Sequence, residues 1–305
     1  MKVSVVIPTY SMDRYEDFCE CMESVLDQTY DDLEIVVIVD GNPEVYERAV
    51  NDYGDREDTI IYGSHDDAGP ISRANMGAVQ ATGDIIALTD DDAVPEEDWV
   101  EELVKMYDKY GCVAAGGRIE PEWVAEGGRA EYIPEEFYFL IGATHRGFQE
   151  DEGEVRNTFG ANLSYRKEEF LKLGGIKLAG LGPDALQGRE TEFCARMEEE
   201  YGMGVIYNPD AVVYHKIYDY RTSKWWLIKR AFWQGVSKRG MEKYVPKATG
   251  NESDFLSKLI LEYIPERVKK VFKGETVKEA NQLFMLLILT AFVGFGYIWG
   301  IFKWR

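Results

Sequence analysis

Two short apolar runs near the amino terminus constrain the fold of this chain more than any other feature of its sequence. Val3–Ile7 (VSVVI) ends at Pro8, and Ile35–Val39 (IVVIV) ends at the turn sequence Asp40-Gly41-Asn42-Pro43. Continuous β-branched runs of this length are typical of strands that are buried on both faces of a parallel sheet. Between them, Tyr15–Gln28 has apolar residues at helical spacing. The order strand, helix, strand predicts an α/β fold that opens with a nucleotide-fold-like half.

The following residues continue this pattern as far as His215. Strands are expected at Thr59–Tyr62, Ile85–Thr89, Asn162–Arg166, Val205–Tyr207 and Ala211–Tyr214, and helices at Ser72–Ala81, Glu96–Tyr110, Lys167–Leu173 and Arg189–Tyr201. Gly111–Glu154 is rich in Gly and Glu and predicts no definite element.

Charge divides the chain at His215. Residues 1–215 contain 17 basic and 47 acidic residues, a net charge of −30, whereas residues 216–305 contain 17 basic and 8 acidic residues, a net charge of +9. An acidic body argues against a nucleic-acid partner, because binding to phosphate backbones requires a cationic face. The basic remainder suits an anionic membrane surface. The acid excess equally fits a solvated surface in a salt-adapted organism.

The cysteines and the amino terminus indicate a cytoplasmic body. Cys19, Cys21, Cys112 and Cys194 show neither C-x-x-C spacing nor a nearby His cluster, so free thiols are expected rather than a zinc site. Met1 leads directly into the first apolar run, without the charged leader and cleavage site of a signal peptide. We therefore expect the body to stay on the side of synthesis.

The carboxyl-terminal part predicts membrane association. Lys224–Arg239 (KWWLIKRAFWQGVSKR) mixes tryptophans with basic residues, as interfacial amphipathic helices do, and Phe255–Phe272 is similar. A core helix with a basic exposed edge explains either segment equally well. Leu283–Phe302 then continues without a charge for a length that suits a hydrocarbon core about 30 Å thick, so it predicts a transmembrane helix. The alternative is a buried hairpin helix of a soluble protein.

The charges that flank this run predict its orientation. Lys269, Lys270, Lys273 and Lys278 precede it, and Lys303 and Arg305 follow it. Cytoplasmic flanks carry the excess of Lys and Arg, so the body is expected in the cytoplasm.

An acidic triplet is the strongest local signal of chemistry. Asp90-Asp91-Asp92 directly follows the apolar strand Ile85–Thr89. Three adjacent carboxylates repel one another unless a cation joins them, and a hard divalent ion that also binds substrate phosphates would do so. The alternative is an acidic cap for a helix that begins near Glu96. Ligands collect beyond the carboxyl ends of parallel strands, where Asp40 and Pro8-Thr9-Tyr10 should also lie, so these segments converge on one crevice.

On these motifs the sequence resembles glycosyltransferase family 2, a family of inverting transferases with the GT-A fold. The matching segments cover about two thirds of the chain: Val3–Tyr10, Glu23–Tyr30, Glu34–Asn42, Gly69–Pro95 and Gly188–Arg196. In Gly69–Pro95 the order of Gly, Asn, Gly, Ala-x-Gly-Asp and the acidic triplet keeps the family's spacing. The resemblance implies a GT-A catalytic domain, a Rossmann-like mixed sheet flanked by helices.

The resemblance also implies a binding site for a nucleotide diphosphate sugar. Pro8, Thr9 and Tyr10 would line the nucleotide pocket, and Asp40 would hydrogen-bond the base. Arg73 and Asn75 would lie near the base and phosphates, and Asp91 would contribute to the donor site. Asp90 would hold the ribose or the metal's water shell, and Asp92 would ligate Mn²⁺ or Mg²⁺ on the donor phosphates. The family commonly has Arg directly before the Asn, and this chain has Ala74 there, so Arg73 would have to act from one position earlier.

The remaining expected residues serve the acceptor side and the metal. Glu190 lies where the family has its catalytic base, with Glu192 as the second choice, although Glu190 would also simply begin a helix favourably. Gly160 and Asn162 would lie beneath the donor sugar and acceptor. His215 would either complete the metal or diphosphate site or be a hydrogen-bonded structural residue. The Gln-x-x-Arg-Trp motif of processive synthases is absent from Trp233–Ser237, which favours transfer of a single sugar.

These expectations combine into one functional hypothesis. A catalytic domain (1–220), an interfacial segment (221–280), a transmembrane helix (281–302) and a short tail (303–305) form a single-pass enzyme of the cell membrane. It would transfer one hexose or hexuronic acid, preferably from a UDP-sugar, to a dolichyl-phosphate-linked glycan. The acidic composition and the tail resemble haloarchaeal transferases that build N-linked glycans of surface-layer glycoproteins. The alternatives are a polyprenyl-phosphate hexose synthase, which charges the bare lipid phosphate, and a non-catalytic membrane scaffold.

Overall fold

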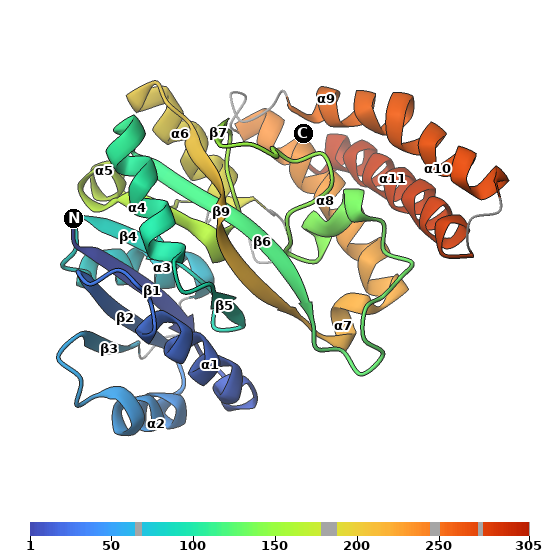
Figure 1. Ribbon diagram of the computed structural model, residues 1–305. Helices are drawn as coiled ribbons and strands as arrows, with labels where there is room; N and C mark the ends of the chain where they lie inside the picture. Colours follow the sequence, from blue (N-terminus) through green and yellow to red (C-terminus); the bar gives the residue numbers. More distant parts are fainter. Residues whose placement is uncertain (65–68, 178–187, 245–250, 274–276, 305) are drawn as a thin grey trace. The chain divides into compact units, whose positions relative to one another are not determined.

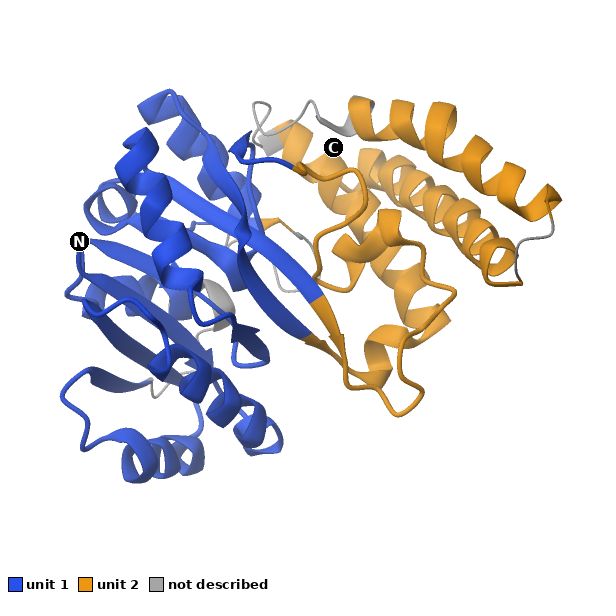
Figure 2. Cartoon of the chain, in the orientation of Figure 1, with its two compact units in different colours: residues 1–120, 151–179, 189–215 blue, residues 121–150, 180–188, 216–305 orange. Residues whose placement is uncertain are grey.

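The chain forms two compact units, which Figure 2 colours separately. The computed structural model describes residues 1–64, 69–177, 188–244, 251–273 and 277–304. Unit 1 comprises Met1–Glu120, Asp151–Ala179 and Arg189–His215, and unit 2 comprises Pro121–Glu150, Gly180–Gly188 and Lys216–Arg305. The four segments expected from the sequence remain a prediction, and Arg305 of the expected tail lies outside the described residues.

Unit 1 is organised around a mixed sheet (Figure 1). Its strands are β1 (Val3–Thr9), β2 (Leu33–Asp40), β3 (Thr59–Ser64), β4 (Ile85–Leu88), β5 (Ala93–Pro95), β6 (Ala114–Trp123), β7 (Gly153–Val155), β8 (Leu163–Arg166) and β9 (Val205–Ile217). Their order is β3-β2-β1-β4-β8-β6-β9-β5, and β7 also pairs with β9. The strands β3, β2, β1 and β4 are parallel, whereas the pairs β4–β8, β6–β8, β5–β9 and β7–β9 are antiparallel. The predicted α/β class is confirmed.

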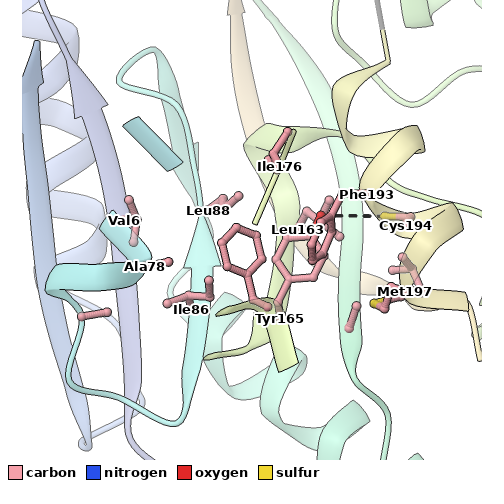
Figure 3. Close-up of a cluster of buried hydrophobic side chains, with 14 of the residues drawn as sticks. Val6, Ala78, Ile86, Leu88, Leu163, Tyr165, Ile176, Phe193, Cys194 and Met197 are labelled. Atoms are coloured by element: carbon pink, nitrogen blue, oxygen red, sulfur yellow. Dashed lines mark hydrogen bonds between the residues drawn. The ribbon is translucent and has the colours of Figure 1, made fainter. Parts of the chain in front are cut away.

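Unit 1 also contains helices, and the longer ones pack buried apolar residues on the sheet. The helices are η1 (Met12–Arg14), α1 (Tyr15–Leu26), α2 (Pro43–Tyr53), α3 (Gly69–Gln80), α4 (Trp99–Tyr110), η3 (Gly160–Asn162), α5 (Lys167–Lys172) and α6 (Arg189–Tyr201). One core cluster joins Ala78 of α3 and Phe193 of α6 to strand residues such as Ile86 and Tyr165 (Figure 3). A Cβ on Gly77 would lie 2.2 Å from Val6 Cγ1, so glycine permits the close approach of α3 to β1.

Two strand predictions need correction in the second half of unit 1. The sequence predicted separate strands at 205–207 and 211–214, but β9 is continuous. Asn208 keeps the intervening residues in place, since its amide donates to the backbone oxygen of Glu102 (3.1 Å) and its Oδ1 accepts from the backbone of Asp210 (3.0 Å). Pro209 therefore does not end the strand.

The Gly-rich segment after residue 111 also contains a strand that the sequence did not predict. β6 occupies a crowded part of the sheet: a Cβ on Gly117 would lie 1.9 Å from the backbone oxygen of Ala211, and one on Gly116 would lie 2.1 Å from Thr158 Oγ1. Close packing here requires glycine, which weakens the apolar pattern by which strands are recognised.

Unit 2 consists mainly of helices. They are η2 (Glu135–Leu140), α7 (Asp219–Thr222), α8 (Lys224–Tyr244), α9 (Asn251–Lys258), a π-helical segment η6 (Leu259–Tyr263), α10 (Ile264–Phe272) and α11 (Val277–Lys303). The buried Arg267 of α10 pairs with the buried Glu136 of η2 (2.7 Å) and donates to Gln282 of α11 (2.5 Å). Among the described residues, α11 is the one helix long and apolar enough to cross a membrane.

Candidate active site

The site is centred on the acidic triplet at the carboxyl end of β4. The backbone N–H of Ala93 donates to the backbone oxygen of Asp90 (3.1 Å), which closes a tight turn, and β5 then pairs antiparallel with β9. In that pairing Ala93 lies opposite His215, so the ladder places the histidine beside the triplet. β5 separates the triplet from α4, whose N-cap residue is Asp98, so the alternative of a helix cap at the triplet is wrong.

Asp90, Asp92 and His215 form a group that fits a divalent cation. His215 Nε2 lies 3.3 Å from Asp92 Oδ1 and 4.0 Å from Asp90 Oδ2. Among the described residues, these three make up a group of His, Cys, Asp or Glu side chains that could share a metal ion. Their ligand atoms all lie within 4.8 Å of one another. Two carboxylate oxygens and an imidazole nitrogen suit Mn²⁺ well and Mg²⁺ less well. Asp90 is 49 % exposed, which leaves coordination positions open toward solvent for substrate oxygens.

Asp91 differs from its neighbours because it points into the protein. It is almost completely buried, and its Oδ2 has no hydrogen-bond partner among the described residues. Burial, followed by the charge of Asp92, raises the pKa of Asp91 to about 7. Asp91 therefore lies behind the ligand group and is not part of it.

Arg14 also reaches the triplet, and the sequence did not predict this. Its Nη1 lies 3.0 Å from Asp92 Oδ2 and 3.7 Å from Asp91 Oδ1. The side chain comes from η1, directly after β1, so it is brought to the same edge of the sheet. The only sequence signal was a basic residue shortly after a strand that ends at the crevice.

The residues expected to line a nucleotide pocket lie at and beside the ends of β1 and β2. Thr9 is buried at the end of β1, whereas the neighbouring Tyr10 is exposed and Pro8 is partly buried. Arg73 of α3 joins this group: its Nε lies 3.4 Å from Asp40 Oδ2, and its guanidinium carbon lies 5.0 Å from the centroid of the Tyr10 ring. Arg73 is therefore next to the residue expected to bind the base.

The side-chain amides of Asn75 and Asn162 form hydrogen bonds within the protein. Asn75 exchanges two hydrogen bonds with the backbone of Ile176, both 3.0 Å long. Asn162 is fully buried; it accepts from the indole of Trp99 (2.8 Å) and donates to the backbone oxygens of Arg118 and Ala211 (2.9 and 2.8 Å). These hydrogen bonds stabilise the structure around the site. The expected contacts of both side chains with the donor remain predictions.

Glu190 and Glu192, the two candidates for the base, have different environments. Glu190 lies in the first turn of α6, is partly exposed and faces η3, since a Cβ on Gly160 would lie 3.0 Å from its Oε1. Glu192 is buried, and both of its oxygens are held by Arg196, at 2.5 and 3.2 Å. The oxygens of Glu192 are occupied by Arg196 and buried, whereas Glu190 is partly exposed, so the geometry favours Glu190 as the base.

Comparison with known proteins identifies the family of this chain. Residues 4–174, more than half of the chain, match the model of the family described as glycosyl transferase family 2. A glucosyl-dolichyl phosphate glucuronosyltransferase from Haloferax volcanii is 43 % identical over 304 residues, which cover 99 % of this chain and 96 % of that protein. Glycosyltransferase AglE from the same organism is 28 % identical over 132 residues, 42 % of this chain and 43 % of that protein.

A solved structure also has the same fold. It is a mannosyltransferase from Pyrobaculum calidifontis in complex with GDP-Man and Mn²⁺. The two structures share a TM-score of 0.61 over 98 % of this chain and 87 % of the other, at 17 % sequence identity. This similarity shows the fold, and it confirms the GT-A architecture that the sequence predicted.

Proposed function

Since this chain belongs to glycosyl transferase family 2 and is therefore a glycosyltransferase, we propose that it transfers a single hexuronic acid from a nucleotide diphosphate sugar to a hexose linked to dolichyl phosphate. The relative that is 43 % identical along nearly the whole chain carries the name of such an activity, which supports the sugar and the acceptor. UDP is the preferred nucleotide of the proposal. The product would serve protein N-glycosylation.

The observation that carries the proposal is the group of Asp90, Asp92 and His215 at the carboxyl end of the sheet. These residues would hold Mn²⁺ or Mg²⁺, and the bound metal would stabilise the negative charge on the departing nucleoside diphosphate. The exposed side of Asp90 leaves space for the diphosphate oxygens. Tyr10, Arg73 and Asp40 are the residues proposed to receive the base and ribose.

Glu190 is the residue proposed to activate the acceptor. Its carboxylate removes the proton of the acceptor hydroxyl while the hydroxyl oxygen forms a bond to the anomeric carbon of the donor. The bond from that carbon to the diphosphate oxygen breaks on the opposite face, and the nucleoside diphosphate leaves with the bonding electrons. One displacement of this kind inverts the anomeric configuration, and the proton ends on Glu190.

The charge distribution supports a lipid-linked acceptor. Residues 216–305 carry the +9 charge and the apolar helix α11, so this part suits an anionic bilayer where dolichyl-linked substrates reside. The catalytic unit is proposed to lie in the cytoplasm, where nucleotide sugars are made available.

The test is sugar transfer from a panel of UDP- and GDP-sugars to two acceptors, bare dolichyl phosphate and glucosyl-dolichyl phosphate. The proposal predicts that a UDP-hexuronic acid labels only the glucosylated lipid, and that EDTA and Asp92→Ala abolish the labelling. Labelling of bare dolichyl phosphate would replace the proposal with a lipid-phosphate sugar synthase. No labelling with any donor, from protein that binds UDP, would indicate a scaffold that has lost its chemistry.

A further inference from the structure

Helix α11 is attached to the rest of unit 2 along its whole length. At its beginning, Lys278 pairs with Glu131, and the Gln282 amide donates to the backbone oxygen of Glu131 (2.9 Å). At its end, the Trp304 indole donates to the backbone oxygen of Val236 (3.0 Å), and Lys243 donates to the backbone oxygen of Trp304 (2.8 Å). An isolated membrane-crossing rod would lack such contacts at both ends.

The carboxyl-terminal half of α11 packs tightly on α8. A Cβ on Gly296 would lie 1.8 Å from the backbone oxygen of Phe232, and one on Gly235 would lie 2.0 Å from the backbone oxygen of Val293. Farther along, a Cβ on Gly300 would lie 2.8 Å from Arg239 Cβ. Both helices therefore advance in the same direction, in contact from Phe232 to the end of α8.

Helix α8 is too charged to accompany α11 across a bilayer. Its charged residues are Lys224, Lys229, Arg230, Lys238, Arg239, Glu242 and Lys243, and its longest uncharged stretch, Ala231–Ser237, is far shorter than the roughly 20 residues a membrane crossing needs. Each such charge would be strongly unfavourable at the centre of a bilayer. The segment Asn251–Phe272, which contacts α11 through α10 and lies beside it in Figure 1, is also rich in charges.

The other side of α11 is an uncovered apolar face. Phe284, Leu287, Phe295, Ile298 and Phe302 are exposed, and their spacing of three, four or eight residues puts them on one side of the helix. Met285, Leu286, Leu289, Gly296 and Gly300 are buried on the opposite side. A helix with one apolar face free and the other covered by a charged neighbour has the form of an element that lies in a membrane surface.

We infer that α11 enters one leaflet of the bilayer without crossing it. Its exposed face contacts lipid acyl chains, while α8 covers the other face and keeps its charges in the headgroup region and water. Lys224, Lys229 and Arg230 are exposed on α8 and match anionic headgroups, as does the +9 charge of residues 216–305. Both ends of the chain then stay on the same side of the membrane, in contrast to a single-pass anchor. This inference does not depend on the enzymatic reaction.

The test is the sidedness of two epitope tags, one at each end of the full chain. The protein is reconstituted in sealed phosphatidylcholine vesicles with and without phosphatidylglycerol, and protease is added outside. We expect both tags of each molecule to be cleaved together, with tighter attachment to the phosphatidylglycerol vesicles. Cleavage of the amino-terminal tag with protection of the carboxyl-terminal tag would show a crossing helix and overturn the inference.

A pair of variants separates lipid contact from folding. Phe295→Asp with Ile298→Asp changes only exposed residues, so the protein should leave the vesicles while its circular dichroism and UDP binding stay unchanged. The matched control, Asn281→Asp, adds a charge at an exposed polar position of the same helix and should remain bound. If the double variant stays on the vesicles, or if the wild-type face instead pairs two copies of the chain in detergent-free solution without binding vesicles, lipid is not the occupant.

Discussion

Asp92 divides its two carboxylate oxygens between different partners. Oδ1 faces His215 at 3.3 Å, and Oδ2 accepts from Arg14 at 3.0 Å. Arg14 thus compensates the buried charge of Asp92 from the side opposite the ligand group. An arginine in this position stabilises the acidic triplet without metal and also repels a cation that binds there.

Replacing Arg14 should therefore have opposite effects on stability and on metal binding. Arg14→Ala leaves Asp91 and Asp92 without their cation, so the metal-free protein should be less stable and Mn²⁺ should bind about tenfold more tightly, by roughly 1.4 kcal/mol. Titration followed by electron paramagnetic resonance measures the affinity, and Arg14→Lys, which keeps the charge, is the control. Weaker Mn²⁺ binding by Arg14→Ala would mean that Arg14 chiefly orients Asp92.

The two glutamates of α6 should separate cleanly by substitution. Glu190→Gln removes the proton acceptor and should lower kcat by about 10² to 10⁴ while leaving UDP binding and thermal stability unchanged. Glu192→Gln disrupts the pair with Arg196 and should lower the free energy of unfolding by about 1 to 3 kcal/mol with a smaller change in kcat. Steady-state kinetics, calorimetry with UDP and thermal melts decide the assignment. The reverse pattern would make Glu192 the base.

At the scale of elements, the parallel half of the sheet could be predicted because its strands are continuous apolar runs. β1 and β2 lie where the runs Val3–Ile7 and Ile35–Val39 indicated, although the strands extend farther, to Thr9 and Asp40. β6 and β9 could not be predicted in the same way, because Gly116 and Gly117 meet crowded neighbours and Pro209 interrupts an otherwise extended segment. The pairing of β5 with β9, which brings His215 to the triplet, depends on residues far apart in the sequence.

Sequence patterns also indicate which residues gather at a site. They say less about what each side chain does there. Tyr10, Asp40 and Arg73 meet at one place because strand ends and the following helix share an edge. The internal hydrogen bonds of Asn75 and Asn162 have no signal in the sequence, since their partners are backbone groups of distant segments.

At the other end of these strands, a buried carboxylate links neighbouring segments of the chain. Glu34 of β2 accepts from Ser4 of β1 (2.5 Å) and from Thr82, and it pairs with Lys2 (2.6 Å). Burial by itself raises the pKa of Glu34. Hydrogen bonds from Lys2, Ser4 and Thr82 more than offset burial and lower that pKa to about 2.

This lowered pKa predicts a defined pH dependence of stability. The group stabilises the fold above its unfolded pKa near 4.5 and loses that contribution as the pH falls toward 2. Glu34→Gln should therefore lower the free energy of unfolding by about 2 to 3 kcal/mol at neutral pH, and its deficit relative to wild type should shrink between pH 4.5 and 2. Urea unfolding at several pH values measures this, with exposed Glu47→Gln as the control. A deficit that does not change with pH would exclude an ionised Glu34 as the cause.

At the scale of the whole molecule, the charge boundary seen in the sequence coincides with a boundary between units. His215 ends unit 1, and Lys216 begins the last segment of unit 2. Unit 2 also takes in Pro121–Glu150, which no contiguous division of the sequence indicates, because its membership depends on distant contacts such as Glu136 with Arg267. The acidic triplet thus lies in an acidic unit, and the apolar helix α11 lies in the basic segment 216–305 of the other unit.

The proposed reaction is a single displacement at this site, with Glu190 as the base. The most direct test is the anomeric configuration of the newly transferred sugar, determined by nuclear magnetic resonance on product made from an α-linked UDP-hexuronic acid and a glucosyl-dolichyl phosphate acceptor. A single displacement gives a β linkage, which wild type should form and Glu190→Gln should not. An α linkage would require two displacements or a front-face reaction and would contradict the role assigned to Glu190.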